Sequence, residues 1–474
     1  MRAWLSFWGG AVLPFIIYCW TLAPDLTWIQ DGGDGGDLVV AAYSLGIPHP
    51  PGYPAYTILA HLFTLLPVGT VAWRVHLFSA ISAAIAAGLI ALIVFDLYPD
   101  TKRADGLLGS WVAAWAWALF PLVWGQAIIA EVYAPFATWV ALTIWIAVCY
   151  FQHSKPFAPL LLGIVWAMAF GFHLTAILLL PVVAWRLWQA RNSILTWIFF
   201  VGGFLLGCSQ WIYLPLRAGQ GVFTWGDPTT LTGWWWLASG ELYRGFMFAS
   251  PPQVWLNRLG VFSEWIVTGF GPIALWLGVL EIARGLKARI GLWSALLVSF
   301  ILFAVFAIGY NTSDSDRYLI PALLIVAIFI GGGAVNLLMA CRGRWGTRGV
   351  TAVWSGGMVL FVLLVGVNSA RMEFSQVPDA PQLREVLNQL PPNAIVVSEE
   401  DRTSFALWYF QFVEQRRVDV LTLDRDLWQF GWYRSEVGVR AHSDLNVALQ
   451  SLSRPVCRVW VDASDIHFLC AAAP

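Results

Sequence analysis

The sequence predicts a polytopic α-helical membrane protein with a small α/β domain at its C-terminal end. Hydrophobic residues make up 59% of the 474 positions and charged residues only 12%, about half the charged share of a soluble protein. Such a chain is neither a soluble globular protein nor a disordered one. Its formal net charge of −1 lacks the basic excess of a nucleic-acid binder, so we expect no nucleic-acid partner.

The uneven distribution of charge divides the chain into two parts. Residues 371–474 hold 24 of the 55 charged residues, which is a soluble composition. We therefore expect a membrane domain over residues 1–370 and an extracytoplasmic α/β domain over residues 371–474. The membrane domain has two long outer loops, at residues 24–71 and 215–259. Function is expected there, because binding and catalytic residues concentrate in loops on a rigid scaffold.

Eleven apolar runs approach the roughly 20 residues that a helix needs to cross a bilayer. They cover residues 4–23, 72–96, 107–126, 130–151, 157–172, 174–189, 193–214, 260–283, 291–310, 318–340 and 350–370. The first run has no small-residue cleavage site before Pro24, so it is expected to remain as an anchor. The apolar segment from Tyr56 to Leu66 is too short to span and is expected at the membrane interface.

The basic residues of the short loops indicate the orientation. With the N-terminus in the cytoplasm, the cytoplasmic side receives 12 of the 17 basic residues before position 371, among them Lys102, Arg103 and Lys155. An odd number of spans then places the C-terminal domain outside. We therefore expect a multi-pass protein of the cell (inner) membrane that is in contact with membrane lipid.

The C-terminal part is predicted to alternate helices and strands. The expected elements are a helix at Pro381–Leu390, a strand at Ala394–Ser398, a helix at Ser404–Gln415, a strand at Val418–Leu423, and a hairpin of Val456–Val461 with Ile466–Leu469. Cys457 and Cys470 fall on this hairpin. A disulfide between them is allowed outside the cytoplasm, but spacing alone cannot decide it.

The first outer loop contains an unusual acidic segment. Asp31, Asp34 and Asp37 lie within seven residues, with four glycines between them that allow the backbone to approach a ligand closely. Carboxylates beside an apolar bundle are costly to desolvate, so they usually have a function or a partner. Capping of the predicted helix Val39–Leu45 is the alternative for Asp34 or Asp37. It does not account for all three acids together.

A proline-rich stretch follows directly, with four prolines between positions 48 and 54. Prolines favour a stiff, extended path. His49 lies inside this stretch, where a histidine has few ways to join a core. It is either a site residue or a solvated loop residue.

Several further outer-side residues are candidates with structural alternatives. Glu131, at the start of a span, is either an active-site acid or a first-turn acid that complements the helix dipole. His173 either binds a ligand or hydrogen-bonds a neighbour. Arg74, Arg217, Arg244 and Arg317 are the arginines expected at the outer surface. Arginine suits phosphate recognition, although ion pairs or headgroup contacts are the default for such residues.

These residues also carry a family resemblance. The run Asp34-Gly-Gly-Asp37, then Ala41 to Gly46, then His49-Pro-Pro-Gly-Tyr53-Pro54 resembles a bacterial membrane family related to the eukaryotic transmembrane protein O-mannosyltransferase. That family usually has Asp-Ser-Gly-Glu in the first segment, so Gly and a shorter acid replace two of its residues here. Further matching segments lie around Ala72–Val75, Glu131–Ala134, Gly171–Thr175, Tyr213–Ala218, Trp225–Pro228 and Trp408–Gln411.

The resemblance implies a GT-C glycosyltransferase with a sugar donor of the polyprenyl-phosphate type. It implies transfer of a mannose-like sugar, with inversion, to a protein, lipid or glycan acceptor on the extracytoplasmic face. An acid of the first outer loop would act at the reaction centre, with Asp34 as the base. The implied site residues are Asp34, Asp37 and Glu131 as catalytic candidates, and His49, Tyr53, Arg74, His173, Arg217 and Arg317 as donor-phosphate ligands.

Three questions stay open at the level of sequence. The three aspartates could hold a divalent cation, which a monophosphate donor does not require. A carrier or flippase of lipid-linked substrates is the main alternative function, although internal repeats and midplane charges typical of carriers are missing from the sequence. A non-enzymatic assembly protein would leave the acidic loop without a role.

Overall fold

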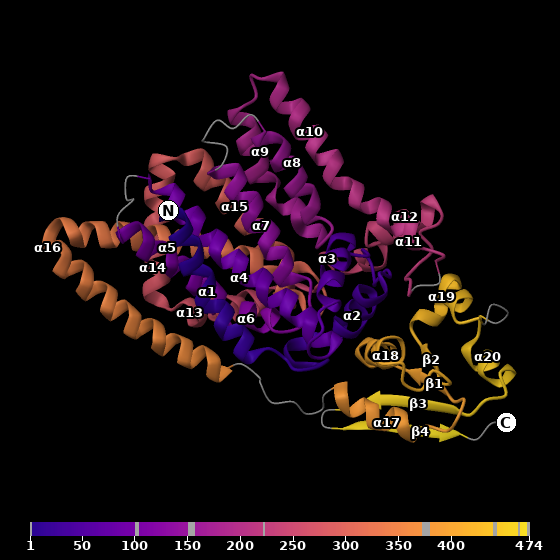
Figure 1. Ribbon diagram of the computed structural model, residues 1–474. Helices are drawn as coiled ribbons and strands as arrows, with labels where there is room; N and C mark the ends of the chain where they lie inside the picture. The colour runs from indigo at the N-terminus through magenta and orange to yellow at the C-terminus, as the bar shows by residue number, and fades with distance from the viewer. Residues whose placement is uncertain are drawn as a thin grey trace.

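The computed structural model describes residues 2–99, 104–149, 157–220, 223–371, 380–438, 443–462 and 465–471. A large helical bundle forms the membrane part, and the C-terminal domain lies against one end of it (Figure 1). Lys102, Arg103 and Lys155, which supported the predicted orientation, lie outside the described residues.

The bundle is built from helices in chain order, and some of their connections contain short 3₁₀ turns. The helices are α1 (Arg2–Thr21), α2 (Gly35–Ser44), α3 (Pro54–Thr64), α4 (Val71–Leu97), α5 (Ala104–Ala118), α6 (Pro121–Ala127), α7 (Tyr133–Val148), α8 (Ala158–Ala169), α9 (Leu180–Gln189), α10 (Ile194–Cys208), α11 (Tyr213–Arg217), α12 (Leu231–Ala238), α13 (Pro252–Phe270), α14 (Pro272–Ala288), α15 (Ile290–Gly309) and α16 (Ile320–Arg371).

Helix α4 lies in the centre and packs against α1, α5 and α7. Its buried alanines, such as Ala83, Ala87 and Ala91, leave little side chain between the helices. Small residues allow helix backbones to approach closely, which is how helices gain packing energy inside a membrane. The bundle therefore provides a rigid support for the loops at its ends.

Several of the helices can cross a membrane, as an integral membrane protein requires. Within the described residues, five stretches are long and apolar enough by themselves: Arg2–Thr21, Val71–Leu97, Ile194–Arg217, Ile290–Gly309 and Ser315–Ala370. The number is seven if each of two bent helix pairs counts as one span. The polytopic class is confirmed, while the count of eleven spans stays a prediction.

Two predicted spans are wrong as single helices. The run 107–126 is divided into α5 and α6, which are bent by 72° relative to each other, and Pro121 at the start of α6 cannot donate the hydrogen bond that would continue α5. The run 260–283 is divided at Gly271 into α13 and α14, which are bent by 101° relative to each other. Gly271 has φ 80° and ψ 150°, a conformation open mainly to glycine, and Pro272 cannot donate the hydrogen bond that would continue α13. The runs 318–340 and 350–370, by contrast, join into α16, which kinks at Gly346. Figure 1 shows its second half running back outside the bundle toward the C-terminal domain.

The C-terminal domain contains a four-stranded sheet. Its elements are α17 (Leu383–Gln389), β1 (Ile395–Ser398), α18 (Asp401–Trp408), a π-helical turn at Tyr409–Val413, β2 (Leu421–Asp424), α19 (Gly431–Glu436), α20 (Leu445–Ser451), β3 (Val456–Val461) and β4 (Ile466–Ala471). The strand order is β2-β1-β3-β4, with β1 parallel to both neighbours and β3 antiparallel to β4. The predicted hairpin is confirmed, and a disulfide joins Cys457 to Cys470 across it.

Candidate active site

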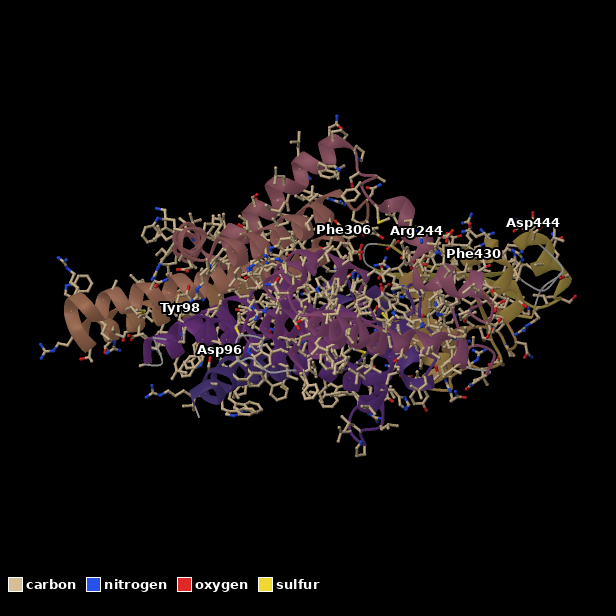
Figure 2. All side chains as sticks on the ribbon, turned by 90° about the horizontal axis from the view of Figure 1, so that it is seen from above. Asp96, Tyr98, Arg244, Phe306, Phe430 and Asp444 are labelled. Atoms are coloured by element: carbon tan, nitrogen blue, oxygen red, sulfur yellow. A yellow bond between two sulfur atoms is a disulfide. The ribbon has the colours of Figure 1, made fainter. Side chains whose placement is uncertain are left out.

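A pocket of about 630 Å³ lies where the two long loops meet the start of α18. Its charged lining residues are Asp31, Asp34, His49, Glu131, Arg244, Asp314, Arg317, Asp401 and Arg402. Figure 2 shows two lining residues, Arg244 and Phe306, on the side of the bundle that faces the C-terminal domain. Asp96 and Tyr98, at the end of α4, lie toward the opposite end of the molecule (Figure 2).

Asp34 offers the pocket an open carboxylate. It ends the 3₁₀ turn Ile29–Asp34 directly before α2, and 45% of its side chain is exposed. Its side chain makes no capping hydrogen bond to α2, so the capping alternative does not apply to it. Burial of the surrounding site raises the pKa of Asp34, the positive charge of His49 lowers it, and neighbouring carboxylates raise it further. A raised pKa makes this carboxylate a stronger base.

Asp37, by contrast, is sealed inside the protein. It lies in the first turn of α2 and is fully buried. Its carboxylate accepts hydrogen bonds from the backbone N–H of His49 at 3.0 Å, from the His49 ring Nδ1 at 2.7 Å, and from Trp225 Nε1 at 2.9 Å. The Asp37 carboxylate is therefore held by these three hydrogen bonds and does not cap α2. It can orient His49, but the pocket lining does not include it.

His49 lies between the two acids. Its Nδ1 contacts Asp37, and its Nε2 lies 3.6 Å from Asp34 Oδ2. Burial alone would lower the pKa of His49, but the charge of Asp34 and the hydrogen bond to Asp37 raise it to about 9. The ring is therefore an imidazolium at neutral pH. Because the residue is only 6% exposed, the alternative of a solvated loop histidine is wrong.

Tyr53, Glu131 and His173 line the same pocket. The Tyr53 ring lies 5.2 Å from the His49 ring. Glu131 is buried and lies two residues before α7. It is therefore not in the first turn of that helix, where an acid would complement the helix dipole. Burial and then the charge of Asp34 raise the pKa of Glu131. His173 Nδ1 accepts a hydrogen bond from the Thr175 backbone N–H at 3.2 Å. This is the hydrogen bond to a neighbour that was one of its two predicted roles.

Arg317 reaches the pocket from the loop before α16. Its guanidinium is 5% exposed and pairs with Asp31 and, at 2.8 Å, with Asp316. Asp31 therefore has a partner and is not simply solvated. Because two carboxylates already neutralise this arginine, a phosphate would have to compete with them.

Arg74 and Arg217 are not among the residues that line the pocket. Arg74 donates hydrogen bonds to the carbonyls of Thr64, Val68 and Gly69, which holds the loop before α4. Arg217 donates to the carbonyls of Ser44 and Leu45 at the end of α2. Both have local structural roles, so their predicted contact with a donor phosphate is not carried into our proposal.

We expect Arg217→Ala to lower thermal stability and to leave the KM for a sugar donor unchanged. The variant leaves the carbonyls at the end of α2 without their charged donor, which costs about 1.5–3 kcal/mol. Thermal unfolding in detergent and donor titration would measure the two effects. A raised donor KM with unchanged melting would restore the phosphate role. Arg244→Ala is the matched comparison, because Arg244 does line the pocket.

The pocket acids do not form a close cluster of metal ligands. Within the part of the chain that the structure describes, one group has its ligand atoms within 4.8 Å of one another: Asp462, Asp465 and His467 on the exposed hairpin. A divalent cation in the pocket therefore stays a prediction.

Several residues of the pocket lining were not predicted as site residues from the sequence. Arg244 was seen only as an outer arginine, and Asp401 and Arg402 were not considered. The partner of Asp37, Trp225, fell within a matched segment but was given no role. For Trp225 that match was a usable signal, whereas nothing in the sequence indicated that α18 would reach the pocket.

Parts of the chain match two family models, and two curated proteins are similar to most of it. Residues 34–196 match the family model of the "Protein O-mannosyl-transferase TMEM260 N-terminal domain", and residues 382–452 match "TMEM260-associated domain 2". The Protein O-mannosyl-transferase TMEM260 of Mus musculus is 26% identical over 430 residues, covering 85% of this chain and 60% of the mouse protein. The protein of the same name from Dictyostelium discoideum is 24% identical over 483 residues, covering 88% and 57%. The chain thus spans about three fifths of the length of these relatives.

Solved structures show the same fold. ArnT from Cupriavidus metallidurans bound to undecaprenyl phosphate superposes with a TM-score of 0.53 at 13% identity, covering 94% of this chain and 91% of ArnT. The oligosaccharyltransferase of Archaeoglobus fulgidus, in complex with Zn and sulfate, gives a TM-score of 0.51 at 12% identity, covering 100% of this chain and 72% of that chain.

The helical bundle with its apolar spans, the sheet domain and these neighbours define a membrane protein of the GT-C fold. Within that class, the chain is similar to the TMEM260 protein O-mannosyl-transferases.

Proposed function

We propose that the protein is a membrane glycosyltransferase that moves a mannose-like sugar from a polyprenyl-phosphate donor to an acceptor hydroxyl. The reaction would take place on the extracytoplasmic face of the cell (inner) membrane. The single observation that carries the proposal is the open Asp34 carboxylate beside the buried His49 imidazolium in a pocket at the end of the bundle.

Asp34 is the base of the proposed reaction. The acceptor oxygen attacks the anomeric carbon of the sugar as Asp34 takes the acceptor's proton. The bond from that carbon to the phosphate oxygen breaks, and its electron pair leaves with the polyprenyl phosphate. One direct displacement from the opposite face inverts the anomeric configuration. Glu131 is buried in the same pocket and is the reserve candidate for the base.

The pocket walls suit a lipid-linked donor. One wall is apolar and includes Leu174, Ile177, Leu178, Phe246, Met247 and Phe306. Several of these side chains are also exposed, Ile177 at 47% and Met247 at 44%, so an isoprenoid chain can leave the pocket along them. The charged wall offers the His49 imidazolium and the Arg244 guanidinium to the departing phosphate. Tyr53 and His173 complete this wall.

The acceptor we favour is a protein hydroxyl of Ser or Thr, because the curated relatives are named protein O-mannosyl-transferases. Lipid and glycan hydroxyls are the other acceptor classes. The carrier alternative predicts movement of the intact donor across the membrane and no new glycosidic bond.

The test is sugar transfer by the purified protein in detergent from polyprenyl-phosphate mannose to a Ser/Thr peptide, with the anomeric configuration of the product read by NMR. We expect transfer with inversion. The rate should rise with pH as Asp34 loses its proton, and should fall again near pH 9 as His49 loses its positive charge. An intact donor after long incubation with peptide, alkyl mannoside and short-chain alcohol acceptors would refute the proposal.

A further inference from the structure

The start of α18 brings the C-terminal domain into the proposed active site. Asp401 and Arg402, its first two residues, line the pocket together with Asp34 and His49. These residues are more than 350 positions away from the acidic loop in the sequence. The C-terminal domain therefore forms one wall of the pocket.

Close packing fixes this wall in place. A Cβ atom on Gly36, in the first turn of α2, would collide with the carbonyl oxygen of Phe405 in α18. The Phe405 ring stacks on the His49 ring with an interplanar angle of 4° and a centroid separation of 6.3 Å. An ion pair of Arg384 with Asp25 at 2.6 Å adds a second connection between the domains. Helix α2, which begins directly after Asp34, and α18 thus form one packed unit.

The two α18 residues differ in what they can still bind. The Arg402 guanidinium donates to Glu400 at 2.6 Å and lies over the Trp28 ring, so it is already engaged. Among the described residues, no donor holds the Asp401 carboxylate, which is exposed toward the pocket. Burial and the charges of Asp424 and Asp34 raise the pKa of Asp401 to about 7. Asp34 and Asp401 line the same pocket.

We propose that Asp401 binds the acceptor and makes the C-terminal domain an acceptor-selecting wall of the active site. The assignment rests on the proposed glycosyltransferase function. The apolar lining residues that would hold a lipid-linked donor belong to the bundle and its loops. Asp401 belongs to the C-terminal domain of soluble composition, so it would meet a molecule that arrives from the aqueous side. An unengaged carboxylate there can accept a hydrogen bond from a hydroxyl or backbone N–H of the acceptor.

The test compares wild type, Asp401→Asn, Asp401→Glu and the control Asp426→Asn. Asp426 lies in the same domain, is exposed, and does not line the pocket. The acceptor probes are a Ser/Thr peptide, an alkyl mannoside and a short-chain alcohol, and hydrolysis of polyprenyl-phosphate mannose by water is measured without an acceptor. For the probe that wild type uses, Asp401→Asn should raise the acceptor KM about tenfold or more. Donor KM and donor hydrolysis should stay unchanged, and Asp401→Glu should recover part of the loss.

The outcomes separate this inference from the function on which it rests. Acceptor KM values within twofold of wild type for Asp401→Asn, with transfer intact, would overturn the acceptor role alone. An equal loss of donor hydrolysis and transfer would also overturn it, because Asp401 would then act on the donor or on the fold. A wild type that transfers sugar to none of the probes and leaves the donor intact would overturn the proposed function and this inference with it.

Discussion

Asp34→Asn is expected to lower the rate of sugar transfer by about 10²–10⁴-fold while the protein remains folded. The substitution keeps the size of the side chain and removes its ability to take a proton. Asp34 makes no capping hydrogen bond and is 45% exposed, so little of the fold depends on its charge. Donor binding should survive, because the asparagine still fits the pocket.

The measurement is transfer by purified variants alongside their thermal unfolding in detergent. Asp227→Asn is the matched control, since Asp227 is exposed, bonds to Thr229 in its own turn, and does not line the pocket. Near wild-type transfer by Asp34→Asn would contradict the assignment. If Glu131→Gln were then inactive and still folded, Glu131 would be the base.

Asp37→Asn is expected to lower the free energy of unfolding by about 3–5 kcal/mol, the cost of removing one partner from a buried charge pair. All three partners of the Asp37 carboxylate are N–H donors, from the His49 backbone, the His49 ring and Trp225. An amide offers one acceptor oxygen and an NH₂ group that cannot accept. The His49 imidazolium would therefore lose its main support inside the protein.

Two measurements check this second prediction. The melting temperature of Asp37→Asn should fall well below those of Asp34→Asn and Asp227→Asn. The alkaline limb of the activity profile should move below pH 9, because the charge and hydrogen bond of Asp37 raise the pKa of His49. A variant that melts like wild type but has lost all transfer would instead make Asp37 the chemical base and reverse the roles of the two aspartates.

The sequence by itself determined the class of protein and the region of the candidate site. Composition identified a membrane protein, because an apolar run of about 20 residues is long enough to cross a bilayer as a helix and is rare in soluble proteins. Alternation and turn residues located the β3–β4 hairpin, because strand pairing between near neighbours depends on local sequence. The glycines around Asp34 and the prolines around His49 marked the loop that lines the pocket, because both residue types shape the backbone in recognisable ways.

The tertiary structure alone decided which of the marked residues face the pocket. Asp34 and Asp37 are three residues apart and chemically identical, yet one opens on the pocket and the other is fully buried under His49 and Trp225. Arg217 has the chemistry of a phosphate ligand, but its guanidinium meets the carbonyls at the end of α2. Asp401 joins the pocket through the packing of Phe405 on Gly36. Side-chain direction and contacts between distant segments depend on the packing of the whole chain, which local sequence patterns do not encode.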